Sequence, residues 1–294
     1  MRRQFLLSLI MPLFLCSRAI GQDAVERPVV VHGEAGEFDE PGDYGQPEWA
    51  ERSQASSTTK LYVLSAYEVF VGLFAQSHFD RHGEPTHDLR QEIEIGLPHR
   101  FEVGFENRVE ASGRDAAETM ASLEGRYALG AWNAIPLNPA IAASYKFGLR
   151  AAPAAGHASP DAFEVSLLVG QEFVPRLQWA ANLFFQQDLG APHNRAAGFT
   201  QDITYLAVTD KVELGAEMRY THDTHKSARH TAANEFIIGP SVSWRPNKYT
   251  VLDLAPLFGC TTDSPDLALF ATVSFEFGGA ESKPAGAFPA PRER

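Results

Sequence analysis

The sequence lacks the long apolar runs that form membrane-spanning helices. After residue 21 no apolar stretch reaches the roughly 18 residues that such a helix needs. The mean hydropathy of −0.20 would by itself indicate a soluble chain. A membrane β-barrel is not detected by either test, because its apolar residues stand at alternate positions and are diluted in any average. A barrel is therefore still compatible with the sequence.

Cysteine and positive charge are also scarce. The chain has 2 cysteines, Cys16 and Cys260, and removal of a leader would leave only the second, so no intramolecular disulfide is expected. Hydrogen bonds and packing must then hold the fold. The net charge of −12 argues against a nucleic-acid partner and favours surfaces that tolerate cations. No motif indicates a cofactor, and we predict none.

The N-terminus has the layout of a secretory signal peptide. Arg2 and Arg3 precede an apolar core at residues 5–16, and residues 19–21 supply the small side chains of a cleavage site. We predict a signal peptide over residues 1–21. The alternatives fit less well, because the core is short for an uncleaved anchor and Leu15 before Cys16 is a poor lipoprotein signal.

Residues 22–60 are acidic, contain Gly and Pro, and show little periodicity. Such a composition buries too little apolar surface to fold alone. We predict a disordered periplasmic extension, with a plug that enters a barrel as the alternative. Tyr44, Pro47 and Trp49 are the candidates for a docking contact.

From residue 61 onward, apolar and polar residues alternate in strand-length segments. Ile93 and Ile95 alternate with Glu92 and Glu94, and the same pattern continues after a short turn. Alternate side chains of a strand point to opposite faces, so each segment has one apolar and one charged face. Many such strands behind an export signal predict a barrel in a bacterial outer membrane, with lipid outside and polar groups inside.

We predict an all-β fold, a transmembrane antiparallel up-and-down barrel over residues 61–278. Twelve strands are expected at 61–76, 88–97, 100–112, 120–130, 138–151, 162–174, 176–189, 198–208, 211–223, 234–246, 249–259 and 267–278. Short links alternate with longer polar ones at 77–87, 113–119, 152–161, 190–197, 224–233 and 260–266. This asymmetry is typical of outer-membrane barrels, and an even strand number places both termini in the periplasm. Residues 279–294 are predicted to be a disordered tail.

Aromatic residues agree with this orientation. Trp132, Trp179, Trp244 and Tyr249 lie beside short links, where they are expected at the lipid headgroup level. The last strand carries apolar residues at alternate positions and ends in Phe275 and Phe277. It resembles the aromatic-ended signal that the barrel-assembly machinery recognises, so that machinery and outer-membrane lipid are the expected partners.

The polar face of the strands defines a candidate lumen in which acidic groups outnumber basic ones roughly two to one by this placement. A shift by one residue would move these groups into hydrocarbon, at a cost of about 2–4 kcal/mol for a midplane Arg or Lys. The candidate lumen-lining residues are Glu92, Glu94, Glu102, Glu106, Arg108, Glu110, Glu124, Arg126, Lys146, Arg150, Glu164, Glu172, Asp188, Asp202, Glu213, Glu217, Arg219, Arg245 and Glu276.

Two interpretations of this lumen remain open. Paired charges could fill the interior, which makes a non-conducting structural or surface-binding barrel. A hydrated path could instead remain, and its acidic excess would favour cations or polar neutral solutes. Twelve strands lie between the eight that side chains can fill and the sixteen that leave a channel. We favour a passive channel or transporter.

Histidines gather in the predicted long loops and could bind copper or zinc there. Their spacing matches no defined metal motif, so we predict no metal site. The loop candidates are His78, His82, His87, His222, His225 and His230. Catalysis is not predicted either: Ser241 and Ser243 could meet His222 or His225, but no motif of a hydrolase surrounds them.

Residues 92–97 and 100–106 read Glu-Ile-Glu-Ile-Gly-Leu and Arg-Phe-Glu-Val-Gly-Phe-Glu around a short turn, and residues 210–215 have a similar character. This pattern resembles the early strands of outer-membrane transporters grouped with meta-pathway phenol-degradation proteins. The resemblance covers most of residues 60–278. It implies an outer-membrane location and uptake of small solutes, with aromatic ones among the candidates, and it assigns no functional residue.

Overall fold

A computed structural model describes residues 42–52, 54–80, 83–149, 160–190, 193–208 and 211–278. The expected signal peptide, residues 22–41, and the tail at 279–294 lie outside this part. A single-turn helix precedes the strands, and two 3₁₀ turns lie between them. The elements are α1 (Glu48–Glu51), β1 (Val69–Phe79), β2 (Thr86–Leu97), η1 (Pro98–Arg100), β3 (Phe101–Ser112), β4 (Asp115–Ala128), β5 (Ala140–Gly148), β6 (Ala162–Val174), β7 (Leu177–Asp188), β8 (Arg195–Val208), β9 (Val212–Thr224), η2 (Lys226–Ala228), β10 (Ala233–Asn247), β11 (Thr250–Gly259) and β12 (Leu267–Phe277).

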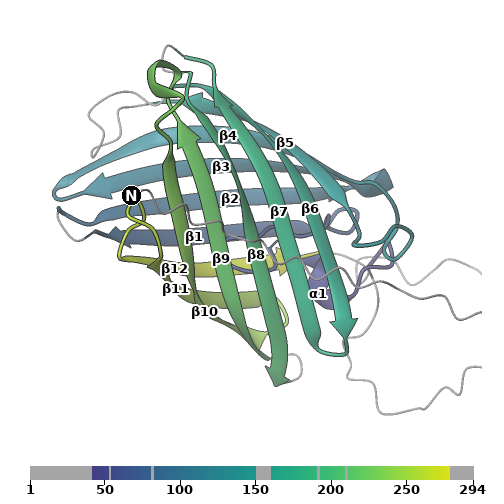
Figure 1. Cartoon of the computed structure of the whole chain (residues 1–294). Helices are drawn as coiled ribbons and strands as arrows, with labels where there is room; N and C mark the ends of the chain where they lie inside the picture. Colours follow the sequence, from purple (N-terminus) through teal and green to yellow (C-terminus); the bar gives the residue numbers. More distant parts are fainter. Residues whose placement is uncertain are drawn as a thin grey trace, which may run out of the picture. The chain divides into compact units, whose positions relative to one another are not determined.

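The twelve strands form one closed antiparallel barrel (Figure 1). Each strand pairs with its neighbours in sequence, and β1 closes the ring by pairing with β12 from Val69↔Phe277 to Phe79↔Leu267. Closure leaves no unpaired strand edge, as a barrel in lipid requires. The predicted fold class, with its twelve strands in up-and-down order, is confirmed.

The alternation of side chains follows the predicted register. In β2, Glu92 and Glu94 are buried inside the barrel, whereas Ile93 and Ile95 are 48% and 39% exposed on the outside. Large apolar residues are exposed in the same way around the whole barrel, and Phe105 and Leu183 are examples. Soluble monomers rarely expose an apolar surface of this extent, so the outward face is suited to hydrocarbon.

Two predicted boundaries are wrong. The first strand begins at Val69 rather than at residue 61, because residues 61–66 leave the wall and lie in the interior. The predicted loop at 113–119 is reduced to Gly113 and Arg114, since β3 and β4 continue their pairing to Ser112↔Asp115. Gly113 has a φ of +60°, which glycine adopts without steric cost in this tight turn.

Part of the inner wall is apolar, which the sequence analysis did not predict. Phe70 and Phe74 of β1, Leu257 of β11 and Phe270 of β12 are buried and share the inward face of these strands. The charged inward residues are concentrated on β2, β3, β4 and β9. Within the described residues, no helix has the length and apolar character required to span a membrane.

Candidate functional site

The interior of the barrel and its short-turn end contain residues 42–66, which we call the plug segment; its Ser53 is not described. Polar contacts join this segment to β2, β3 and β4 on one side and to β8 and β9 on the other. A solvated periplasmic extension over residues 42–60 is therefore not what the structure shows. The plug alternative describes this part better, because its few basic side chains find partners among the lumen acids.

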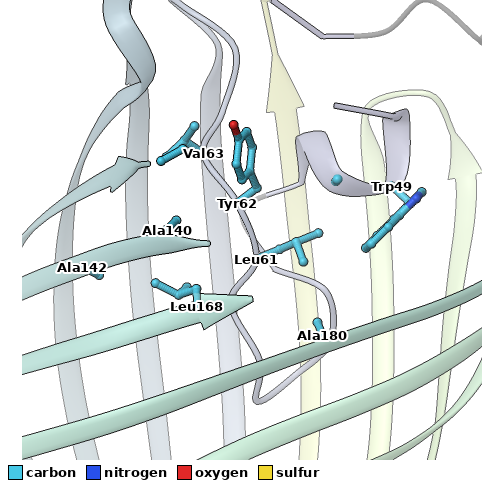
Figure 2. Close-up of a cluster of buried hydrophobic side chains, with 10 residues drawn as sticks. Trp49, Leu61, Tyr62, Val63, Ala140, Ala142, Leu168 and Ala180 are labelled. Carbon is cyan, nitrogen blue, oxygen red and sulfur yellow. The ribbon is translucent and has the colours of Figure 1, made fainter. Parts of the chain in front are cut away.

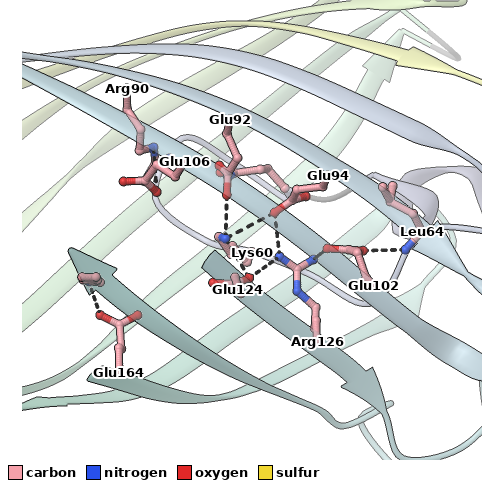
Figure 3. Close-up of polar contacts among 12 residues, drawn as sticks. Lys60, Leu64, Arg90, Glu92, Glu94, Glu102, Glu106, Glu124, Arg126 and Glu164 are labelled. Atoms are coloured by element: carbon pink, nitrogen blue, oxygen red, sulfur yellow. Dashed lines mark hydrogen bonds and ion pairs between the residues drawn. The ribbon is translucent and has the colours of Figure 1, made fainter. Parts of the chain in front are cut away.

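Lys60 holds the plug segment to three strand carboxylates (Figure 3). Its Nζ lies 2.8 Å from Glu92 Oε1, 3.3 Å from Glu94 Oε1 and 2.9 Å from Glu124 Oε1. Both glutamates of β2 are almost fully buried. Without Lys60, these carboxylates would stand in the interior with fewer opposite charges.

Arg126 of β4 extends this cluster toward the short-turn end of the barrel. The guanidinium is fully buried and lies 3.1 Å from Glu94, 2.9 Å from Glu102 and 3.0 Å from Glu124. It also donates to the carbonyl oxygen of Tyr62 at 3.0 Å, while Glu102 accepts from the backbone NH of Leu64 at 2.8 Å. The same residues thus brace the wall and fix the backbone of the plug segment.

A second set of contacts holds the opposite side of the plug segment. Arg52 Nη2 lies 2.8 Å from Glu213 Oε1 of β9. Thr58 donates to Glu217 Oε2 through its hydroxyl at 2.9 Å and through its backbone NH at 3.2 Å. The segment is therefore anchored to walls that face each other across the lumen.

Burial and charge act in opposite directions on the two basic residues of the plug segment. Burial on its own would lower the pKa of the Lys60 ammonium, but Glu124, Glu92 and Glu94 raise that pKa well above its usual value. Burial would likewise lower the pKa of Arg52, but Glu213, Glu276 and Asp253 together more than offset it, so that the pKa is raised. Both groups stay charged at neutral pH.

An apolar cluster supports the plug segment at the short-turn end (Figure 2). Trp132, in the link between β4 and β5, packs edge-on against Trp49 at 5.5 Å and against Tyr62 at 5.2 Å between ring centroids. Leu61 is buried against Gly170. Of the aromatics predicted at the headgroup level, Trp132 thus lies elsewhere, because it covers the plug segment; Trp244 is exposed on the outside.

Above the plug segment, toward the long loops, the lumen contains a cavity of about 480 Å³. Gln54, Ser57, Thr58 and Lys60 of the plug segment belong to its lining. The lining has five basic and five acidic residues: Lys60, Arg90, Arg108, Lys146 and Arg219 against Asp88, Glu106, Glu124, Glu164 and Asp223. The predicted acidic excess is absent here. The predicted residues of this lining are three acids and three bases, and Asp88 and Asp223 balance Lys60 and Arg90.

The predicted lumen residues divide by depth. The buried ones at the short-turn half are Glu92, Glu94, Glu102, Arg126, Asp202, Glu213, Glu217 and Arg245. The residues that line the cavity are Glu106, Arg108, Glu124, Lys146, Glu164 and Arg219. At the ends of the strands, Glu172 accepts from the backbone NH of Arg176, and Asp188 is buried, while Glu110 and Glu276 are half-buried. Arg150 lies outside the described residues.

Several residues of the lumen were missed by the sequence analysis. Arg52 and Lys60 precede the strands, so no register argument could place them inside. Arg90 lies 4.1 Å from the ring centroid of Phe74 and 3.8 Å from Glu106, and its place in the β2 alternation could have identified it. Phe184 and Phe270 also line the cavity, which gives a polar lumen an aromatic component.

The histidine candidates are dispersed among polar partners. His87 Nδ1 bonds Ser77, His222 Nδ1 bonds Asn234, and His225 Nδ1 bonds Asn194. His78 bonds Gln76. His230 lies in the loop before β10, and His82 is outside the described residues. Among the residues that the structure describes, no group of three or more His, Cys, Asp or Glu could hold a metal ion.

The serine candidates lie on the inward face of β10, and the Ser241 hydroxyl has no hydrogen-bond partner among the described residues. Ser243 hydrogen-bonds Asp253 of β11, and the neighbouring strand residue Ser241 is part-buried. His222 is engaged with Asn234, so the candidate pair of a serine and a histidine is not assembled at this site.

No family model matches the chain, and no curated protein matches it. Several solved structures do. The KdgM porin is 12% identical, with 71% of this chain and 99% of that chain covered and a TM-score of 0.48. The NanC porin is 8% identical, with 70% of this chain and 99% of that chain covered and a TM-score of 0.49. The COG4313 outer membrane channel from Pseudomonas putida F1 is 10% identical, with 81% of this chain and 99% of that chain covered and a TM-score of 0.48. The fold rests on the strand pairings described above, and the meta-pathway resemblance stays a prediction.

Proposed function

We propose that this protein is a passive channel for small solutes in a bacterial outer membrane. The observation that carries the proposal is the cavity of about 480 Å³, lined by charged and aromatic side chains, within a closed barrel whose outer face is apolar. A barrel that only needed to be filled could close its lumen with packed side chains. Here the long-loop half keeps a polar space that a hydrated solute could enter.

The plug segment restricts the short-turn half of the lumen. It is held by ion pairs and hydrogen bonds to facing walls, so the same interactions that stabilise the barrel also narrow the path. The balanced charges of the cavity favour polar or zwitterionic solutes with weak preference for either sign. This differs from the cation preference expected from the strand residues alone.

A non-conducting barrel is the second candidate, and the plug segment is the observation that favours it. If the segment stays docked at all times, its contacts make a closed interior, and the loops become the surface that meets a partner. The membrane location, the assembly machinery and the exported N-terminus apply equally to both candidates.

Planar-bilayer recordings separate the two candidates. The intact protein should give small, discrete current steps, and a variant without residues 42–60 should give larger ones because the short-turn half is open. Correct insertion is checked by heat-resistant migration of the folded barrel. If both proteins insert correctly and neither conducts, the channel proposal is wrong and the non-conducting barrel is supported.

A further inference from the structure

The outer face of the barrel has an apolar groove of about 720 Å³ across β3 to β7. Its lining includes Phe101, Tyr127, Val165, Leu183 and Phe185, which are bulky residues around a depression. It differs from the cavity in the lumen both in its position, on the lipid-facing side, and in its almost purely apolar character.

The depression is caused by two small residues side by side. Gly125 of β4 pairs with Ala143 of β5, while the rows on either side of them are bulky: Tyr127↔Ile141 toward the short turns and Leu123↔Tyr145 toward the loops. A Cβ atom built on Gly125 meets no other atom within 4 Å. The missing side chains thus leave real open space in the wall rather than a position filled by a neighbour.

A positive charge lies at the short-turn end of this groove. His99 and Arg100 both have φ of +66°, and this turn brings Arg100 back over the end of β4. Arg100 Nε donates to the carbonyl oxygen of Ala128 at 3.2 Å and Nη2 to the hydroxyl of Tyr127 at 3.3 Å, with Cζ 5.8 Å from the Tyr127 ring centroid. None of these partners, all within the described part of the chain, carries a negative charge.

We propose that this groove binds one phospholipid, with an acyl chain in the depression at Gly125 and Ala143 and the phosphate at Arg100. Apolar space and a charged donor stand in the order in which a lipid presents its chain and its headgroup, and arginine is well suited to phosphate. The inference rests on the membrane location in the proposed function, but it does not depend on conductance.

Native mass spectrometry of the full-length barrel tests this proposal. The protein is delipidated in a mild detergent and titrated with dipalmitoyl phosphatidylglycerol, with dipalmitoylglycerol and inorganic phosphate as separate probes. Gly125→Leu fills the depression, at a position where a Cβ atom meets no other atom within 4 Å, and Arg100→Gln removes the charge. The matched controls are Ala216→Leu on the outward face of β9 and Lys248→Gln, since Lys248 also lies over a ring, that of Tyr249, beside a short turn.

The expected result is one retained phosphatidylglycerol in the unchanged protein and in both controls. Retention should fall roughly tenfold in Arg100→Gln, the effect of losing one charge-assisted hydrogen bond, and at least as much in Gly125→Leu. Dipalmitoylglycerol and inorganic phosphate should each be retained weakly. Equal retention of the phosphate-free lipid, equal loss in the controls, or no loss in Gly125→Leu would each overturn the proposal. Because no current is measured, a non-conducting barrel could still pass this test.

Discussion

Lys60 Nζ lies 2.8 Å from Glu92 Oε1, although Lys60 precedes the first strand and Glu92 belongs to the second. The pair connects a segment inside the lumen to the wall that surrounds it. Both side chains are largely removed from solvent, and Glu94 and Glu124 share the same ammonium. This one ammonium therefore contacts three carboxylates that the alternation of the strands turns inward, and Arg126 supplies a second positive charge to two of them.

Replacement of Lys60 by Gln should undock the plug segment more readily. The change leaves buried carboxylates short of a partner, which costs about 3 kcal/mol, the lower end of the range for breaking a buried pair, and raises the undocked population roughly a hundredfold. Chymotrypsin cleavage at Trp49 and Tyr62 measures undocking, because this protease does not depend on the lysine. Lys211→Gln at an exposed short turn is the control. Equal cleavage in the two variants would contradict the assignment.

From neutral pH upward, docking of the plug segment should weaken only in strong alkali. The pKa of Lys60 is raised on docking, so its contribution is fully present below the undocked pKa of about 10.4 and is lost as the pH rises through the docked value. Tyr62 acts in the same direction, because burial raises its pKa to about 12. Protection from chymotrypsin should stay constant from pH 7 to about 10 and fall above that. A fall between pH 7 and 9 would show that other groups control docking.

The barrel could be predicted from the sequence because strand alternation is a local pattern. Glu92, Ile93, Glu94 and Ile95 assign their own faces, and the structure places them as the pattern predicts. The apolar inward residues of β1, β11 and β12 were not predicted, since Phe74 or Leu257 on an inward position breaks the rule that the inside is polar. These apolar inward side chains pack against residues that are distant in sequence, and the alternation within one strand gives no information about such contacts.

The plug segment could not be predicted from its own residues. Its composition is acidic and aperiodic, and its contacts join positions far apart in sequence, 161 residues in the case of Arg52 and Glu213. One signal was present on the strands: inward acids outnumbered inward bases, which in a closed interior requires counter-charges from elsewhere. Lys60 and Arg52 are such counter-charges.

Gly96 of β2 should be essential for close contact between the wall and the plug segment. A Cβ atom built there would lie 1.9 Å from the carbonyl oxygen of Ser65, and backbone atoms cannot yield as a flexible side chain can. Gly96→Ala should therefore displace residues 64–66 and destabilise docking by about 1–3 kcal/mol, as overpacking does. Gly125→Ala, where a methyl group meets nothing, is the matched control. Chymotrypsin sensitivity that is unchanged in Gly96→Ala would show that the segment does not rest on this strand.

If solutes cross the barrel through the cavity above the plug segment, its lining charges should set the ion preference of the current. Lys146 lies 2.8 Å from Glu164, and both side chains are partly open to the cavity, so either can be changed without leaving a fully buried charge. Lys146→Glu changes the lining from five basic and five acidic residues to four basic and six acidic ones. In a KCl gradient, the reversal potential should then move toward the equilibrium potential of K⁺. Glu164→Lys should move the reversal potential toward the equilibrium potential of Cl⁻. Lys211→Glu, outside the lining, should leave the reversal potential unchanged. Currents that persist with the same reversal potential in all three variants would mean that ions bypass this cavity.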